Sequence, residues 1–261
     1  FEGQTRKVLM QAPKNGFFYV IDRLTGELLS AEKYTTVTWA RGIDLESGRP
    51  IENAEARYYN NPDKKALVYP GVNGSHSWQP MSYSPDTGLV YLPTQDFPSI
   101  YVQDPAHGLV VPPLPESVEQ HGYLIAWDPV SQSERWRIEH ELAINGGTLS
   151  TAGNLVFQGT ATGQLWAYVA DSGKRLWSTL GSSMQAAPIT YRAKGQQYVL
   201  APVGLGLLFD ITPRINVKVD AIYKIGFSDY LDGVSEKANP DKNDSYGMMR
   251  VKLVYTPKAR R

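Results

Sequence analysis

The chain repeats one short pattern, two strand-like runs joined by a turn, and this repeat limits the folds that are open to it. Three copies align on their turns: Val20–Ser30 (VIDRLTGELLS), Ala126–Trp136 (AWDPVSQSERW) and Ala167–Trp177 (AYVADSGKRLW). Asp, Ser, Thr and Gly tolerate tight turns, so each copy predicts an antiparallel hairpin. We expect Trp136 and Trp177, which share one position of the repeat, to be buried between neighbouring repeats.

Two more hairpins are expected at Met81–Pro93 and Leu149–Val169, and no segment of useful length shows helical periodicity. Short strands with frequent turns are typical of sandwiches, barrels and propellers. A recurring unit favours the propeller, in which each blade repeats one four-stranded antiparallel sheet. We therefore expect an all-β fold with blades near 78–140 and 147–203.

Long segments interrupt the repeat at Lys33–Ser77 and Gln95–Gln120, and we expect both to be rich in loops. Loops of this length inside a compact domain are often functional or pack over a neighbour. Plain surface decoration is the alternative, and the residues alone leave both open.

Composition excludes several classes of protein. The 261 residues carry 26 basic and 26 acidic side chains, so a nucleic-acid partner is not expected. Without cysteine the chain has no disulfide and no thiolate metal site. No apolar run approaches the ~18 residues of a membrane-spanning helix. The chain starts at Phe1 with neither Met nor a signal peptide, which we interpret as a fragment or a processed product.

Five segments follow one another in an order that resembles a known enzyme family. They are APKNGFFYVIDRLTGELLSA, VTWARGIDLESGRPI, HSWQPMSYSPDTGLVYLP, INGGTLSTAGNLVFQGTATGQLWAY and AAPITYRAKGQQYV, starting at Ala12, Val37, His76, Ile144 and Ala186. From about Thr5 to Val203 the chain resembles the C-terminal part of the pyrroloquinoline quinone (PQQ)-dependent, or quinoprotein, alcohol dehydrogenases. The resemblance implies a partial quinoprotein propeller over residues 1–203.

In that family the propeller holds PQQ on its axis beside Ca²⁺ or a lanthanide, and the enzyme oxidises a primary alcohol to an aldehyde. The resemblance therefore implies a small alcohol substrate, an electron acceptor such as a cytochrome c, and a periplasmic location. The family's catalytic Asp and its metal ligands lie upstream of the part that this chain matches. We accordingly expect no catalytic or metal-ligating residue in this chain, and no activity in isolation.

The resemblance also implies cofactor-binding residues. Lys14 matches the basic residue at the reactive carbonyl edge of PQQ, where a fixed cation stabilises developing negative charge. Asn145 is expected to bond a carboxylate or carbonyl of PQQ, with Gly146 allowing close approach of the backbone. From the residues alone, a solvated lysine at a strand entrance is the favoured interpretation of Lys14, and an ordinary turn is as good an interpretation of Asn145–Gly147 as a cofactor contact.

Three further positions follow from the same match. Ser77 stands after His76, where many relatives carry Asn, and is expected to contact the cofactor. Trp78 is expected to line the substrate funnel, with burial in a blade core as the alternative. Gly204 is placed near the cofactor, although the relatives' Gly-Trp-Gly-Gly segment lacks its Trp here. His76 has no carboxylate or second histidine at metal spacing and is not expected to be a ligand.

Residues 204–261 change character and form a separate tail. Asn216–Lys224 and Tyr246–Tyr255 alternate with period two, which predicts an antiparallel hairpin. We expect it to dock on two preceding strands, Ala187–Tyr191 and Gln196–Ala201, with a detached hairpin as the alternative. The tail resembles the last hairpin of an outer-membrane β-barrel protein; a divergent family tail is the other interpretation.

A second class of function stays open at this point. A PQQ-free propeller acting as a binding or assembly scaffold at the outer membrane would carry similar hairpins. The turns Lys14-Asn15-Gly16 and Asn145-Gly146-Gly147 favour the dehydrogenase, because a scaffold has no need of them.

Overall fold

The computed structural model describes residues 3–61, 63–180, 186–193, 196–212, 215–228 and 245–255. Within these ranges the regular structure consists of β-strands and two short 3-10 helices, Ala54–Ala56 and Tyr58–Asn60. The expected all-β fold is confirmed. No helix in the described ranges has the length and apolar character that crossing a bilayer requires.

The N-terminal sheet, which we call the first blade, has the strand order β1–β2–β3. Its strands are β1 (Val8–Gln11), β2 (Phe17–Asp22) and β3 (Leu28–Lys33). A hairpin of β4 (Ala40–Ile43) and β5 (Pro50–Glu52) follows. Residues of β4 pack against one face of the first blade.

The second blade is a four-stranded sheet with the order β12–β11–β8–β7. Its strands are β7 (Ser82–Ser84), β8 (Leu89–Asp96), β11 (His121–Asp128) and β12 (Ser133–His140). The blade expected near 78–140 is thus confirmed.

The long segments between the repeats are more ordered than we expected. They contribute a three-stranded sheet, β10–β9–β6, built from β6 (Lys65–Val68), β9 (Ser99–Asp104) and β10 (Gly108–Val110). We expected these segments to be rich in loops and did not predict this sheet, because strands this short give no periodic signal that can be read from the sequence.

The third blade has the order β13–β14–β15–β16. Its strands are β13 (Thr148–Thr151), β14 (Leu155–Gly159), β15 (Gln164–Val169) and β16 (Arg175–Leu180). The blade expected over 147–203 therefore ends earlier, because the strands after Leu180 belong to the next sheet.

The fourth sheet has the order β17–β18–β19–β20 and contains the tail. Its strands are β17 (Ile189–Ala193), β18 (Gln196–Thr212), β19 (Ile215–Ser228) and β20 (Ser245–Tyr255). Asn216 pairs with Val254 and Lys224 with Tyr246, so the predicted hairpin and its docking are confirmed. Strand β18 runs through residues 203 and 204, and the division of the chain there stays a prediction.

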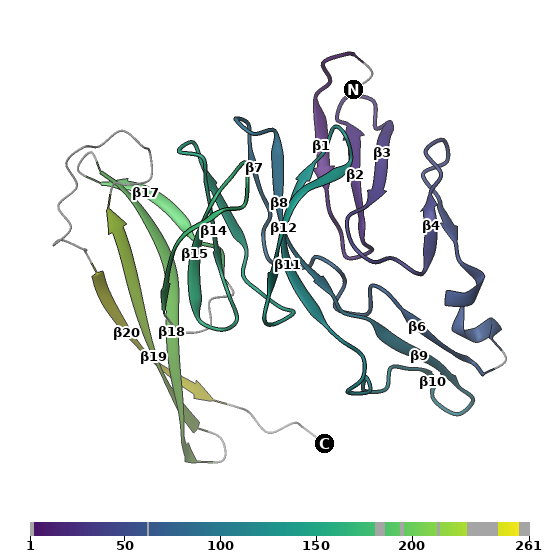
Figure 1. Ribbon diagram of the computed structural model, residues 1–261. Helices are drawn as coiled ribbons and strands as arrows, with labels where there is room; N and C mark the ends of the chain where they lie inside the picture. Colours follow the sequence, from purple (N-terminus) through teal and green to yellow (C-terminus); the bar gives the residue numbers. More distant parts are fainter. Residues whose placement is uncertain are drawn as a thin grey trace.

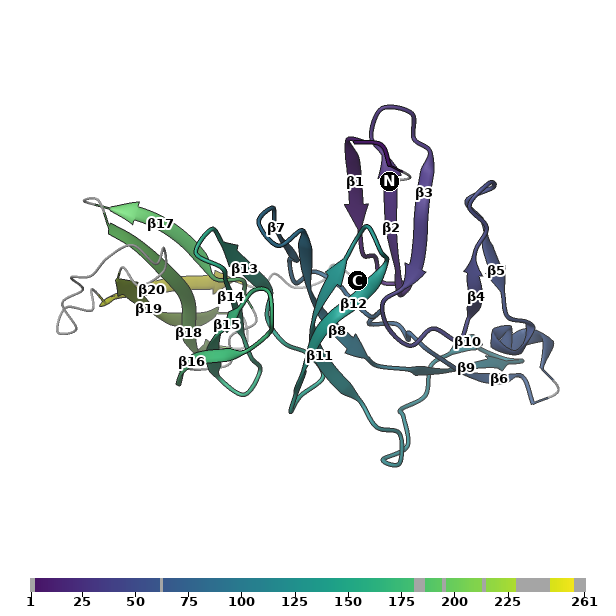
Figure 2. The same cartoon turned by 45° about the horizontal axis from the view of Figure 1, so that its top comes forward.

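The first, second and third blades and the fourth sheet lie side by side in this order, in an open row (Figures 1 and 2). The β6–β9–β10 sheet lies beside the second blade, away from the third (Figure 1). This succession of antiparallel sheets is a partial propeller.

Alternating residues on the central strands connect each blade to both of its neighbours. On β8, Val90 and Leu92 pack towards the first blade, whereas Leu89 and Tyr91 pack towards the third. Successive side chains of a strand point to opposite faces, so a strand with both faces covered reads as a continuous apolar run. The cores are therefore continuous from blade to blade.

The three sequence repeats form equivalent hairpins. Each pairing contains a bulge at the same place, after Val20, Ala126 and Ala167 respectively. In the first copy, the carboxylate of Asp22 accepts hydrogen bonds from the backbone N–H groups of Leu24 and Thr25. These bonds, with that of Leu24 the strongest influence, lower the pKa of Asp22.

The two tryptophans of the repeat differ in their surroundings. Trp136 donates from Nε1 to the carbonyl oxygen of Ala170 at 3.0 Å, and its ring centroid lies 5.7 Å from that of Tyr91. Trp177 is 38% exposed, so its expected burial was wrong. Gly173, in the turn of the next copy of the repeat, lies against the Trp136 ring, whereas no further copy of this turn follows Trp177 within the described residues.

Trp136→Ala should lower the free energy of unfolding by about 3 kcal/mol, because it removes a large ring from the contact between the second and third blades. Trp177→Ala is the matched control and should cost less than half as much. Urea denaturation of both variants measures the difference. Equal losses would show that Trp136 does not join the blades.

Candidate functional site

Three segments that carry the predicted site residues lie in contact. We call them the lysine turn (Ala12–Gly16), the connector (Gly74–Pro80) and the asparagine loop (Leu142–Gly147). The N–H of Ser75 in the connector donates to the carbonyl oxygen of Lys14 at 3.1 Å, and the N–H of Thr148 donates to that of Pro80 at 2.9 Å. The connector thus joins the other two segments.

His76 holds the connector at its centre. Its Nδ1 lies 2.6 Å from the carbonyl oxygen of Ala12, and its Nε2 lies 2.7 Å from that of Gln79. The ring is buried and both partners are carbonyl oxygens, which only accept, so each N–H that the ring carries donates to one of them. His76 therefore has a structural role in the connector.

Lys14 is exposed, and its aliphatic stem packs on Gly74. A Cβ added at Gly74 would lie 2.5 Å from the Cβ of Lys14, and Gly74 has a φ of +75°. Only glycine suits that position. The ammonium group lies 3.4 Å from the carbonyl oxygen of Val72, a long contact that leaves the cation accessible.

Asn145 is only 5% exposed, and both ends of its amide have partners within the chain. Its Nδ2 donates to the carbonyl oxygen of Leu142 at 2.7 Å, and its Oδ1 accepts from the N–H of Ala161 at 3.2 Å. The side-chain amide has two N–H donors and one oxygen. The bond to Leu142 uses one donor, so the other N–H can serve a further partner. Asn145 thus shapes its own loop first.

Of the other predicted residues, three lie in these segments and one does not. Ser77 is half-buried and Trp78 is 61% exposed, so Trp78 does not lie in a blade core. Gly146 is buried in the asparagine loop. Gly204 lies in β18 opposite Ile222 and is not part of the three segments.

No feature of the sequence pointed to Gln95, which supports the connector from β8. Its side-chain amide donates to the carbonyl oxygen of Gly74 at 2.8 Å, and its backbone N–H donates to that of Ser75 at 2.8 Å. A small cavity of about 10 Å³ lies between the connector, the asparagine loop and β8, and Gln95 and Asn145 form part of its lining. It is far too small for a cofactor.

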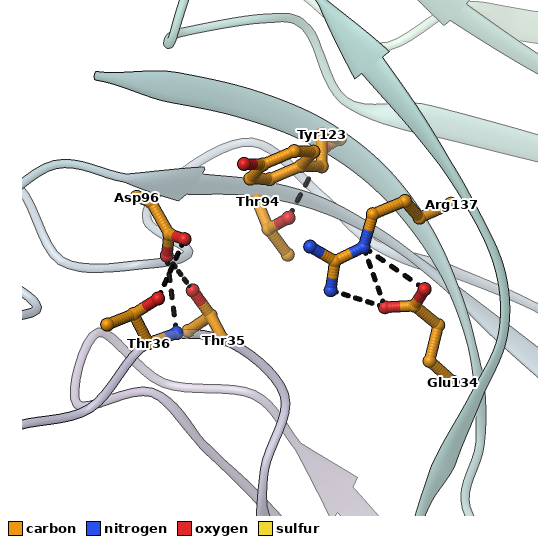
Figure 3. Close-up of polar contacts among 7 residues, drawn as sticks. All are labelled: Thr35, Thr36, Thr94, Asp96, Tyr123, Glu134 and Arg137. Atoms are coloured by element: carbon orange, nitrogen blue, oxygen red, sulfur yellow. Dashed lines mark hydrogen bonds and ion pairs between the residues drawn. The ribbon is translucent and has the colours of Figure 1, made fainter. Parts of the chain in front are cut away.

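Next to Gln95, Asp96 fastens the first blade to the second (Figure 3). Its carboxylate accepts hydrogen bonds from the hydroxyl groups of Thr35 and Thr36, the latter at 2.9 Å. Beyond it, the Arg137 guanidinium lies 4.7 Å from the ring centroid of Tyr123, a cation–π contact (Figure 3). The Asp96 contacts hold the segment that follows β3 against β8.

Gly74→Ala should displace Lys14, because the new methyl group would overlap its stem. The positive φ alone costs about 1–2 kcal/mol, and the overlap adds about 1–3 kcal/mol. Gly26→Ala is the matched control, since Gly26 has a φ of +79° with nothing within 4 Å of the added Cβ. Thermal unfolding and NMR shifts of Lys14 compare the two, and equal effects would contradict this packing.

A known protein family matches part of this chain, and individual relatives match most of it. The family model of the glucose/ethanol/alcohol dehydrogenase β-propeller domain, a PQQ family, matches residues 118–199. The quinohemoprotein alcohol dehydrogenase ADH-IIG of Pseudomonas putida is 47% identical over 80% of this chain and 32% of the relative. The 1-butanol dehydrogenase (cytochrome c) of Thauera butanivorans is 46% identical over 78% of this chain and 32% of the relative.

Solved structures agree. That of ADHIIG from Pseudomonas putida HK5 has a TM-score of 0.74 and 47% sequence identity, and the match covers 77% of this chain and 33% of that one. The quinohemoprotein alcohol dehydrogenase from Comamonas testosteroni gives a TM-score of 0.72 and 41% identity, with coverage of 77% and 32%.

The chain spans about a third of the length of the curated relatives that it matches. These relatives lend no support to the expected likeness between the tail and an outer-membrane barrel. Over about 80% of its length, the chain is similar in sequence to the PQQ-dependent quinohemoprotein alcohol dehydrogenases.

Proposed function

We propose that this chain supplies one part of the wall of a PQQ site in an enzyme that oxidises primary alcohols to aldehydes. The observation that carries the proposal is the connector, which joins the accessible cation of Lys14 to the exposed ring of Trp78 and to the asparagine loop. The sequence identity to quinohemoprotein alcohol dehydrogenases supports it.

The residues present fit one side of such a cofactor. PQQ is a planar quinone with carboxylate groups, and an accessible ammonium is a suitable partner for either kind of oxygen. Trp78, 61% exposed, offers an aromatic surface, and Gly74 lets Lys14 lie close to the connector. When bound, PQQ supplies the two-electron acceptor that the amino acids of this chain lack.

The roles of this chain's own residues follow from their positions. Lys14 would hold a positive charge beside a quinone oxygen of bound PQQ, and Trp78 would exclude water from the approach of the alcohol. The Ca²⁺ or lanthanide ligands and the general base are proposed to lie outside this chain. Within the described residues, no group of three or more acidic or histidine side chains is placed to hold a metal ion.

Partners and location complete the proposal. The name of the Thauera relative includes cytochrome c, which supports a cytochrome c as electron acceptor of the whole enzyme. A periplasmic location follows from the same homology. Ser77 and Gly204 are proposed as weaker cofactor contacts, Ser77 because it lies in the connector between His76 and Trp78 and Gly204 on the sequence match alone.

Titration of the chain with PQQ, followed by quenching of tryptophan fluorescence, tests the proposal. Lys14→Ala should weaken binding about tenfold, the value of a charge-assisted hydrogen bond. Lys7→Ala is the control, since Lys7 is also exposed but lies outside the three segments. The absence of saturable binding, or equal effects of the two variants, would contradict the proposal.

Dye reduction in the presence of PQQ and a primary alcohol tests the second part. The chain alone should show no turnover, because the general base and the metal ligands are proposed to lie outside it. Sustained turnover would show that the chain carries its own catalytic residues and would overturn that part.

A further inference from the structure

We infer that Gln158 is a positioning residue for the asparagine loop and acts on the cofactor through that loop. The inference rests on the proposed function. Gln158 lies on β14 within the apolar run Leu155–Gly159 and is 0% exposed. A fully buried amide in such a strand is costly unless every polar atom is bonded, so its partners show what it does.

Both ends of the Gln158 amide are bonded. Nε2 donates to the carbonyl oxygen of Gly146 at 2.9 Å, and Oε1 lies 2.8 Å from Nε2 of His140. The carbonyl of Gly146 can only accept, so the amide nitrogen must face it. The amide oxygen then faces His140, whose Nε2 must carry the hydrogen.

His140 suits this role because it is buried at the end of β12. Burial lowers the pKa of His140, an effect that the hydrogen bond to Gln158 partly offsets. The ring is therefore neutral at pH 7, with its one hydrogen on Nε2. Its plane meets the Trp166 ring edge-on at 86°, which holds its orientation. A rigid donor thus sets the position of the Gln158 oxygen.

Residues on and just after β14 hold the asparagine loop at three points. Besides the bond from Gln158, the N–H of Gly146 donates to the carbonyl oxygen of Gly159 at 2.8 Å. The N–H of Ala161 donates to Oδ1 of Asn145 at 3.2 Å. Loss of the Gln158 bond would leave a buried carbonyl unpaired, and the loop would have to move to reach water.

The loop has little freedom to move without disturbing its neighbours. A Cβ added at Gly122 would lie 2.7 Å from Nδ2 of Asn145, and one added at Gly147 would lie 2.4 Å from Cδ of Pro80. The loop is thus confined between β11 and the connector. A shift of Gly146 is passed to Pro80, and so to Ser77 and Trp78.

Two substitutions separate the bonds of Gln158. Gln158→Met keeps the length of the side chain and removes both bonds. Gln158→Glu keeps an acceptor for His140 and removes the donor to Gly146. Gln132→Met is the matched control: the Gln132 amide donates to Oγ of Ser30 and to the carbonyl oxygen of Pro129, so it touches neither the loop nor the residues that hold Gln158.

Amide exchange by NMR, without cofactor, is the first measurement. Exchange at Gly146 and Ala161 should accelerate about tenfold in both Gln158 variants and stay unchanged in the control. The ¹⁵N signal of His140 Nε2 should keep its protonated character in Gln158→Glu, because that variant retains the acceptor. Unchanged loop exchange in both Gln158 variants would overturn the inference.

PQQ titration is the second measurement and has an outcome that a merely structural role would not produce. The dissociation constant should rise about tenfold in both Gln158 variants and remain at the wild-type value in the control. Faster exchange with wild-type affinity would reduce Gln158 to a structural residue and overturn the inference. If the wild-type chain does not bind PQQ, the proposed function fails, and a cofactor role of Gln158 fails with it; the exchange data then still decide whether Gln158 positions the loop.

Discussion

The rest of the site depends on the buried ring of His76, which lies between the carbonyl oxygens of Ala12 and Gln79. The contact to Ala12 holds the connector against the lysine turn, and the contact to Gln79 fixes the conformation of the connector itself. The connector in turn places Pro80, whose carbonyl anchors the asparagine loop through Thr148. Segments far apart in the sequence therefore form one surface through the connector that this histidine holds. Exposed residues such as Lys14 and Trp78 take their positions from this buried frame.

The blades supply the frame with rigidity. Because both faces of β8 and β11 are covered, the second blade cannot shift without disturbing the cores on either side. Gln95, near the end of β8, bonds the connector at Gly74. Asp96, the last residue of β8, bonds Thr36 in the segment that follows the first blade. The site thus lies where blades meet, and each of its three segments contacts at least one of the others.

The sequence was sufficient for local features and failed where a partner lies far along the chain. The hairpins were predictable, since strand alternation and turn residues lie within a few positions of each other. The exposure of Trp177 was not predictable, because it depends on whether another copy of the repeat packs against it. His76 and Gln158 were missed as organising residues, since His76 bonds Ala12 and Gln158 bonds Gly146, contacts that close only in the folded chain. A lone Gln in the apolar run of β14 was the one signal available.

The central claim is that the connector couples the lysine turn to the asparagine loop, and amide hydrogen exchange in a His76→Leu variant tests it most directly. The N–H groups of Ser75 and Thr148, which bond Lys14 and Pro80, should lose protection together, by about tenfold. His107→Leu is the control, because the side chain of His107 is 77% exposed and should leave both amides unchanged. Retained protection of Thr148 in His76→Leu would show that the two segments are held independently and would contradict the account.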